Sequence, residues 1–171
     1  MKILVPVDGS EQSIKALKYA IFLLKLTGIK SNSSKEKEGS SEIVVVNVLP
    51  HFQIPLGFEK PMKSIKTGNA ISLSEYIAEM NELLKTEWIE KLYEIKNKYT
   101  DSGISIRTQL LEGSHSSRTI ADSIVKFSTD EEVDLIVIGN VGLGGISKIK
   151  ALGSVSRNLV EISNRPVLVV H

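Results

Sequence analysis

The stretch VDLIVIGNVGLGGISKIKALGSVSRNLVEISNRPVLVV, residues 133–170, decides how this chain folds. It opens on an apolar, β-branched run at residues 133–138, which predicts a buried strand. Five glycines then fall within residues 139–153, and the pattern resumes with a helix at 154–162 and a strand at 166–170. Glycine interrupts regular structure at an entropic cost, so the cluster indicates either special loop geometry or the close approach of a ligand.

The rest of the chain repeats this alternation of short β-branched runs and longer amphipathic stretches. Residues 42–49 form an unbroken apolar run, typical of a strand that is covered on both faces. Residues 103–113 alternate apolar and polar side chains, which suits the edge of a sheet. A first strand is expected at residues 2–7, and helices are expected at 10–28, 72–98 and 116–127. The alternation predicts an α/β fold, an open parallel sheet with helices on both faces.

Two stretches break the rhythm. Residues 31–41 are polar and low in complexity, and we expect a surface loop there. Residues 50–69 contain three prolines and no clean period, and so long a connection indicates a functional flap or a disordered segment. The chain shows no internal repeat, and we predict that residues 1–171 form a single domain.

Composition narrows the function classes. The chain is 42% hydrophobic and 24% charged, as in an ordinary soluble protein, and its net charge of +1 favours neither nucleic acid nor an acidic membrane as partner. It has no cysteine, which excludes disulfides and thiolate chemistry. No apolar run reaches the length of a membrane span, and no basic-then-apolar signal region opens the chain. We therefore expect a cytoplasmic protein.

The glycine cluster matches neither of two common phosphate-binding motifs. No Gly-Lys-Ser/Thr closes it, as a Walker loop requires, and Ser147 stands where a dinucleotide fingerprint has its third glycine. What remains is a glycine-rich approach to the start of a helix at Gly153, where free N–H groups favour anions. The hydroxyl groups of Ser154 and Ser156 could add donors. The alternative is that the glycines only form a turn and Ser154 only caps the helix.

Other candidate groups carry less information. His51, His115 and His171 are scattered without the spacing of metal ligands, and we interpret them as loop, capping-region and terminal residues. Asp8 ends the first strand, where a carboxylate can form a hydrogen bond with a ribose or hold a metal through water. The alternative interpretation is that Asp8 only forms the turn. No catalytic Ser-His-Asp set or carboxylate pair is identifiable from spacing.

Two segments resemble the universal stress protein family. ILVPVDGSEQSIKALKYA, residues 3–20, is similar to the family's opening strand and Pro-x-Asp-x-Ser turn. The quoted C-terminal stretch is similar to its ending, with Gly-x2-Gly, a spacer, Gly-Ser, a short helix and Pro-Val-Leu-Val-Val. The resemblance implies a five-stranded parallel sheet in the order 3-2-1-4-5, of the Rossmann-like, adenine nucleotide α hydrolase-like type, and commonly a homodimer.

The resemblance also implies an adenine nucleotide site. Its glycine pattern marks the branch that binds ATP or AMP, with Mg²⁺ left open. Gly139 and Gly142 match the first glycines, Gly153 and Ser154 match the Gly-Ser, and Val48 would present backbone groups to the adenine. The remaining residues implied for this site are Pro6, Val7, Asp8, Ile138, Val155 and Ser156.

One departure from the family pattern leaves alternatives open. Ten residues, 143–152, separate the second glycine from Gly153, where the pattern has nine. The extra residue can be absorbed before the helix, or it can turn the N–H groups away from the phosphates. We therefore keep two alternatives beside nucleotide-dependent stress signalling: a dimeric interaction module paired through its last strand at Val167 and Val169, and a slow ATPase.

Overall fold

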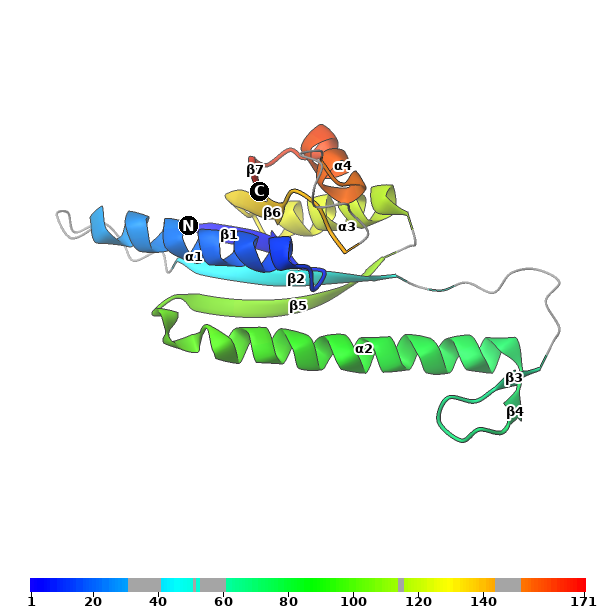
Figure 1. Ribbon diagram of the computed structural model, residues 1–171. Helices are drawn as coiled ribbons and strands as arrows, with labels where there is room; N and C mark the ends of the chain where they lie inside the picture. Colours follow the sequence, from blue (N-terminus) through cyan, green and yellow to red (C-terminus); the bar gives the residue numbers. More distant parts are fainter. Residues whose placement is uncertain (31–40, 51, 53–60, 114–115, 144–151) are drawn as a thin grey trace.

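The computed structural model describes residues 1–30, 41–50, 52, 61–113, 116–143 and 152–171. Five strands form one parallel sheet: β1 (Lys2–Pro6), β2 (Glu42–Pro50), β5 (Ser105–Gly113), β6 (Leu135–Gly139) and β7 (Val167–Val170). Their order across the sheet is β5-β2-β1-β6-β7 (Figure 1). Numbered among themselves these strands have the order 3-2-1-4-5, which confirms the predicted fold.

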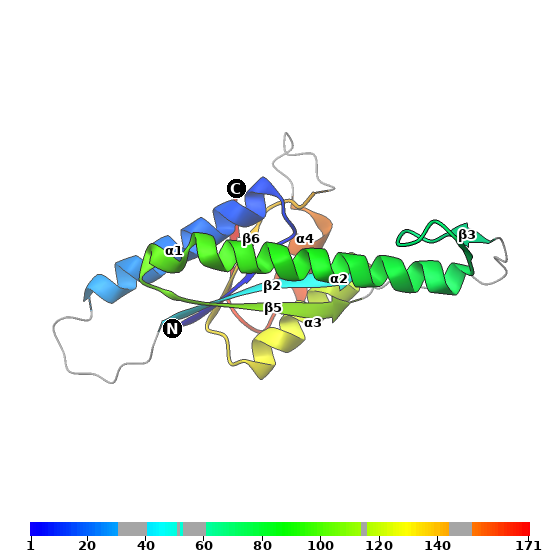
Figure 2. The same cartoon turned by 90° about the horizontal axis from the view of Figure 1, so that it is seen from below.

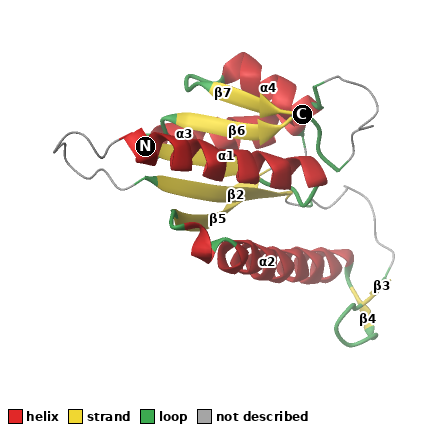
Figure 3. Ribbon diagram, turned by 60° about the vertical axis from the view of Figure 1, so that its left-hand side comes forward, coloured by secondary structure: helices red, strands yellow, loops and turns green. Residues whose placement is uncertain are grey.

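Four helices cover the sheet: α1 (Glu11–Lys30), α2 (Leu73–Lys98), α3 (Ser117–Asp130) and α4 (Ser154–Ile162). Successive strand residues point to opposite faces, so the core divides into two layers. Ile3 and Val5 of β1 pack in one layer with residues of α1 and α2, whereas Leu4 packs in the other with residues of α3 and α4. Figure 3 shows α1 and α2 on one side of the sheet.

The strand patterns read from the sequence agree with these positions. Residues 43–49 of β2 are all buried, because β1 and β5 flank this strand and helices cover both of its faces. In β5 only Ile106 is buried, as expected for a strand at the sheet edge. A capping box marks the start of α2. The Oγ of Ser72 accepts from the N–H of Glu75, and the carboxylate of Glu75 accepts from the N–H of Ser72.

A short hairpin replaces part of the expected flap. Within residues 50–69 and just beyond them, β3 (Met62–Lys63) and β4 (Ala70–Ile71) pair antiparallel. Strands of two residues are too short to leave a periodic pattern in a sequence, which is why this hairpin was not predicted. Figure 2 shows it at the far end of α2. Residues 51 and 53–60 of the flap, and 31–40 of the polar loop, lie outside the described residues.

Two carboxylates of α2, those of Glu79 and Glu82, attach the hairpin to the helix. Glu79 accepts hydrogen bonds from the Oγ of Ser64 and from the N–H of Ile65, both at 2.8 Å. The Ser64 hydrogen bond is the main reason that the pKa of Glu79 lies below its usual value. Lys66 adds an ion pair with Glu82. The long second helix and the hairpin therefore form one connected unit.

Charged side chains close the amino-terminal end of the sheet. Glu131, just after α3, accepts from Arg107 Nη2 of β5 at 2.6 Å and from Lys2 Nζ of β1 at 3.3 Å. Arg107 also pairs with Glu42 of β2, and the N–H of Lys2 donates to Asp134. The pKa of Glu131 is lowered, mainly by the hydrogen bond from Arg107 and further by Lys2. Residues from three adjacent strands thus share one network.

Candidate functional site: a pocket at the carboxyl ends of β1, β2 and β6

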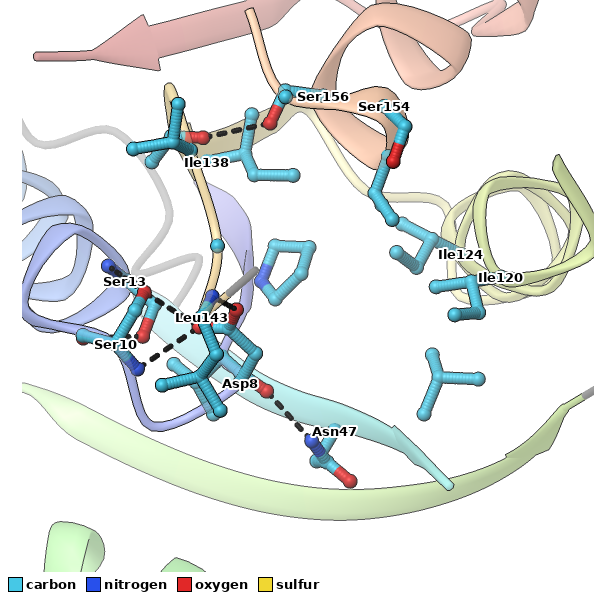
Figure 4. Close-up of a pocket in the computed structure, with 18 of the residues that line it drawn as sticks. Asp8, Ser10, Ser13, Asn47, Ile120, Ile124, Ile138, Leu143, Ser154 and Ser156 are labelled. Carbon is cyan, nitrogen blue, oxygen red and sulfur yellow. Dashed lines mark hydrogen bonds between the residues drawn. The ribbon is translucent and has the colours of Figure 1, made fainter. Parts of the chain in front are cut away.

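A pocket of about 400 Å³ opens at the carboxyl ends of the central strands. The strand order reverses here, between β1 and β6, which is the usual place for a ligand in an open parallel sheet. All eleven residues predicted for the nucleotide site line this pocket: Pro6, Val7, Asp8, Val48, Ile138, Gly139, Gly142, Gly153, Ser154, Val155 and Ser156. Figure 4 shows many of them around one space.

Asp8 connects the turn after β1 to the glycine loop. Its Oδ1 accepts from the N–H of Ser10 at 3.0 Å and from the Ser10 hydroxyl at 2.6 Å. Its Oδ2 accepts from the N–H of Leu143, 135 residues further along the chain, at 2.9 Å. Asp8 thus forms the turn, and it lies in the pocket wall with a carboxylate that is already engaged (Figure 4). Its contact with a ribose or a metal stays a prediction.

Close approaches explain the glycines. A Cβ on Gly139 would lie 2.8 Å from the backbone carbonyl carbon and oxygen of Gln12, so α1 can pack against β6 only because no side chain intervenes. A Cβ on Gly142 would overlap the Oδ2 of Asp8. On Gly153 it would come within 3.3 Å of the Asn140 oxygen. Gly139 and Gly142 therefore each allow two segments to touch, and Gly153 eases a third close approach.

The start of α4 presents donors to the pocket. Gly153 is its N-cap and carries no side chain to accept from the first-turn N–H groups. The N–H groups of Ser154, Val155 and Ser156 have no partner within the helix, and the helix dipole makes this end electropositive. The carboxylate of Asp8 is the one charged group among the described residues that line the pocket. Any anion held by the described wall would rest on backbone donors.

The two serines of this helix start differ. The hydroxyl of Ser156, a buried residue, donates to the Gly139 carbonyl at 2.8 Å and so ties α4 to the end of β6. In this structure the Ser156 hydroxyl donates within the protein, and a contact between this hydroxyl and a ligand stays a prediction. Ser154 is exposed, and its hydroxyl lies at the rim of the pocket (Figure 4).

The opposite end of the pocket is apolar. The last backbone hydrogen bond between the β1 segment and β2 runs from the N–H of Val7 to the oxygen of Val46, at 2.8 Å. Alternate residues of a strand direct their backbone groups to the same side, so the N–H and C=O of Val48 face the gap that opens where β1 ends. Hydrophobic side chains surround that gap: Val48, Ile120, Ile124, Ile138 and Val155.

Several lining residues were not identified from the sequence. Ile120 and Ile124 belong to the inner face of α3, and an apolar pair at i, i+4 beside the predicted site could have indicated them. Asn47 has a buried amide whose Nδ2 donates to the Val7 carbonyl at 2.8 Å; its Oδ1 has no hydrogen-bond partner among the described residues. A polar residue inside an apolar strand was the available signal.

The ten-residue spacer is anchored at its first residue and by the glycine that follows it. Leu143 donates to Asp8, and the N–H of Gly153 donates to the Asn140 carbonyl at 2.7 Å. The start of α4 therefore lies directly against the end of β6. Residues 144–151, with Gly144, Gly145, Lys148 and Lys150, lie outside the described residues, as do His51 and His115; His171 is exposed at the end of the chain.

The fold and this pocket define a class, the open parallel α/β proteins with a glycine-lined pocket at the switch point of the sheet. A family model described as the universal stress protein family matches residues 1–171. Universal stress protein MJ0531 of Methanocaldococcus jannaschii is 34% identical over 170 residues, covering 99% of this chain and 81% of the relative. The chain belongs to the universal stress protein family.

Solved structures of the family share the fold. The structure of MJ0577, a protein of the same archaeon, superposes with a TM-score of 0.70 at 28% identity, covering 99% of this chain and 94% of its own. A universal stress protein from Archaeoglobus fulgidus in complex with dAMP superposes with a TM-score of 0.56 at 22% identity, over 100% of this chain and 98% of its own. In the described residues of the present chain, no helix is long and apolar enough to span a membrane.

Proposed function

We propose that this protein binds an adenine nucleotide, ATP or AMP, in the pocket at the ends of β1, β2 and β6, and acts as a nucleotide-dependent stress-response protein. One observation carries the proposal: the start of α4, whose N-cap Gly153 has no side chain, lines the same pocket as the apolar gap beside β2 and the glycines after β6. A nucleotide has the matching polarity, with an anionic end and a flat, largely apolar base. The pocket volume is within the usual range for small ligands.

Each end of the pocket suits one part of the nucleotide. Phosphate oxygens would accept from the N–H groups of Ser154, Val155 and Ser156, with the Ser154 hydroxyl as a further donor. The base would lie between Val48 and Ile124, where the N–H and C=O of Val48 offer the donor and acceptor pair that the edge of adenine requires. Pro6, Val7 and Asp8 would line the ribose between the two ends.

Family membership supports this assignment. Universal stress proteins with the same fold have been solved in complex with dAMP and with cAMP, at 22% and 19% identity to this chain. Both ligands contain adenine and a phosphate. ATP adds two phosphates, which would extend from the start of α4 toward solvent, and Mg²⁺ would accompany them.

The proposal assigns binding rather than turnover. Slow ATP hydrolysis is the alternative, and prolonged incubation with ATP and Mg²⁺ separates the two: we expect no release of phosphate above that from a Gly142→Ala variant.

We further propose that the chain, as one cytoplasmic domain, forms a homodimer through β7. This strand lies at the edge of the sheet, and its residues Val167–Val170 are only half buried. An exposed edge of apolar residues tends to pair with another strand. Val167 and Val169 pack toward α3 and α4 and are the side chains expected at that contact.

Equilibrium dialysis tests the nucleotide proposal directly. We expect ATP and AMP to bind with dissociation constants in the micromolar to millimolar range, and GTP to bind at least about tenfold more weakly because its base presents O6, an acceptor, to the Val48 carbonyl. The fluorescence of Trp88, the only tryptophan in the sequence, gives a second measure of binding. Its ring lies close to the turn that contains Asp8, because a Cβ built on Gly9 would be 3.7 Å from it. Absence of adenine nucleotide binding would contradict the proposal.

A further inference from the structure

The outer surface of α1 carries an exposed apolar stripe. Tyr19, Phe22 and Leu26 follow one another at helical spacing and are between 42% and 51% exposed. They lie opposite Leu17 and Leu24, which are buried against the sheet. The rings of Tyr19 and Phe22 are 5.9 Å apart and present a joined aromatic surface. Apolar side chains gathered on one exposed helix face indicate a docking surface.

The same helix is basic. Residues 11–30 contain four lysines and one glutamate, and that glutamate, Glu11, pairs with Lys15. Lys18 and Lys25 flank the stripe, are exposed, and form no ion pair with any other described residue. We call Lys18, Tyr19, Phe22, Lys25 and Leu26 the basic stripe.

The outer surface of α2 has the complementary character. Leu83, Ile89 and Tyr93 are between 41% and 64% exposed. Glu90 and Glu94 share this side of the helix, are exposed, and have no ion-pair partner in the part of the chain that the structure describes. We call these five residues the acidic stripe. Residues 73–98 contain six glutamates and four lysines, so the two helices have charges of opposite sign.

We propose that a second copy of this chain docks on the helix layer, with the basic stripe of one copy against the acidic stripe of the other. Both helices cover the same face of the sheet (Figure 3). A two-fold axis between the two copies therefore places α1 of each copy against α2 of the other, and the same contact forms twice. Opposite charges flank apolar side chains in each contact, which gives complementarity as well as burial.

A second copy fits this layer better than an acidic membrane does. The basic stripe alone would suit an anionic lipid surface. However, α2 lies on the same face and presents Glu90 and Glu94, which an anionic surface would repel. The interface is also separate from the β7 edge, because the helix layer covers a face of the sheet and β7 borders it. It does not depend on nucleotide binding.

Charge reversal provides the test. We measure the mass of the assembly by sedimentation velocity without nucleotide. We expect the Lys18→Glu/Lys25→Glu variant and the Glu90→Lys/Glu94→Lys variant each to form an assembly of half the mass that the parent protein forms. Each faces like charges in both contacts with itself. An equimolar mixture of the two variants is expected to regain the parent mass, because a mixed pair has opposite charges in both contacts. Self-association of each variant is expected to be weaker by more than about tenfold.

Controls make every outcome informative. Lys126→Glu on α3, an exposed lysine on the other face of the sheet, is expected to keep the parent mass. A cooperative urea transition in each variant shows that it is folded. A parent that is already monomeric, variants with unchanged mass, or a mixture that does not regain mass would each overturn the proposal. Retention of the parent mass together with loss of binding to phosphatidylserine vesicles by Lys18→Glu/Lys25→Glu would assign the basic stripe to lipid instead.

Discussion

The two ends of the sheet differ in how their polar groups are paired. At the amino-terminal end, Lys2 and Arg107 both pair with Glu131. At the carboxyl-terminal end, glycines bring the segments together, and the N-cap of α4, Gly153, has no side chain to accept from the first-turn N–H groups. A parallel sheet gathers like strand ends at each edge, so one end can be closed by internal pairs while the other is kept for a ligand.

The largest expected effect concerns the packing of α1 on β6. Gly139→Val would place a side chain where the Gln12 backbone already lies 2.8 Å from the Cβ position, so neither segment can yield without moving the helix. We predict a loss of about 3 kcal/mol in the free energy of unfolding, measured by urea denaturation. Gly153→Val is the matched control and should lose less, because the Cβ would meet the Asn140 oxygen at 3.3 Å rather than backbone atoms at 2.8 Å. Equal losses would contradict the packing account.

The next effect separates binding from stability. Gly142→Ala would push the Asp8 carboxylate aside and remove the acceptor for the Leu143 N–H. Because the displaced atoms belong to the end of a side chain near the surface, we predict a change of under about 1 kcal/mol in unfolding free energy. Affinity for ATP should fall by more than about tenfold, measured by calorimetry. Full retention of affinity would show that the loop geometry is not needed for the nucleotide.

The closed end should respond to acid. Arg107 and Lys2 lower the pKa of Glu131 in the folded state, so this carboxylate stabilises the fold above the ordinary glutamate pKa of 4.5. That contribution is lost as the pH falls below 4.5 and through the lowered pKa. Glu131→Gln should remove about 1 kcal/mol at pH 7 and flatten the acid dependence, measured as urea midpoints from pH 7 to pH 3.

A matched substitution isolates the network. Glu161→Gln on α4 changes an exposed glutamate that has no ion pair with another described residue. The urea midpoint of this variant should follow that of the parent chain at every pH. If Glu131→Gln also follows the parent, the ion pairs contribute nothing to the stability of the amino-terminal end.

The smallest effects distinguish the two serines at the start of α4. Ser156→Ala removes the hydroxyl that donates to the Gly139 carbonyl and should lower the unfolding free energy by about 1 kcal/mol, with nucleotide affinity kept. Ser154→Ala should leave stability within about 0.5 kcal/mol and weaken ATP binding about threefold. Urea denaturation and calorimetry on both variants measure this. If Ser156→Ala weakens ATP binding and Ser154→Ala does not, the ligand contact belongs to the Ser156 hydroxyl and the account is contradicted.

Much of the fold and of the site could be predicted because period and glycine placement are local signals. The apolar run of residues 42–49 indicated a central strand, and the positions of Gly139, Gly142 and Gly153 indicated one loop and one helix start. The engagement of the Ser156 hydroxyl could not be predicted, since it depends on how closely α4 approaches β6. The hairpin at residues 62–71 was not predicted, because strands of two residues are too short to show a periodic pattern in the sequence.

Backbone amide shifts would test the central claim most directly. The claim is that the start of α4 and the backbone groups of Val48 in β2 together hold an adenine nucleotide. In a ¹H–¹⁵N correlation spectrum titrated with ATP, we predict that the amides of Ser154, Val155, Ser156 and Val48 show the largest shifts. The amide of Lys2, at the opposite end of the sheet, should stay in place. Saturable shifts elsewhere with these four unmoved, or no shifts at millimolar ATP, would contradict the account.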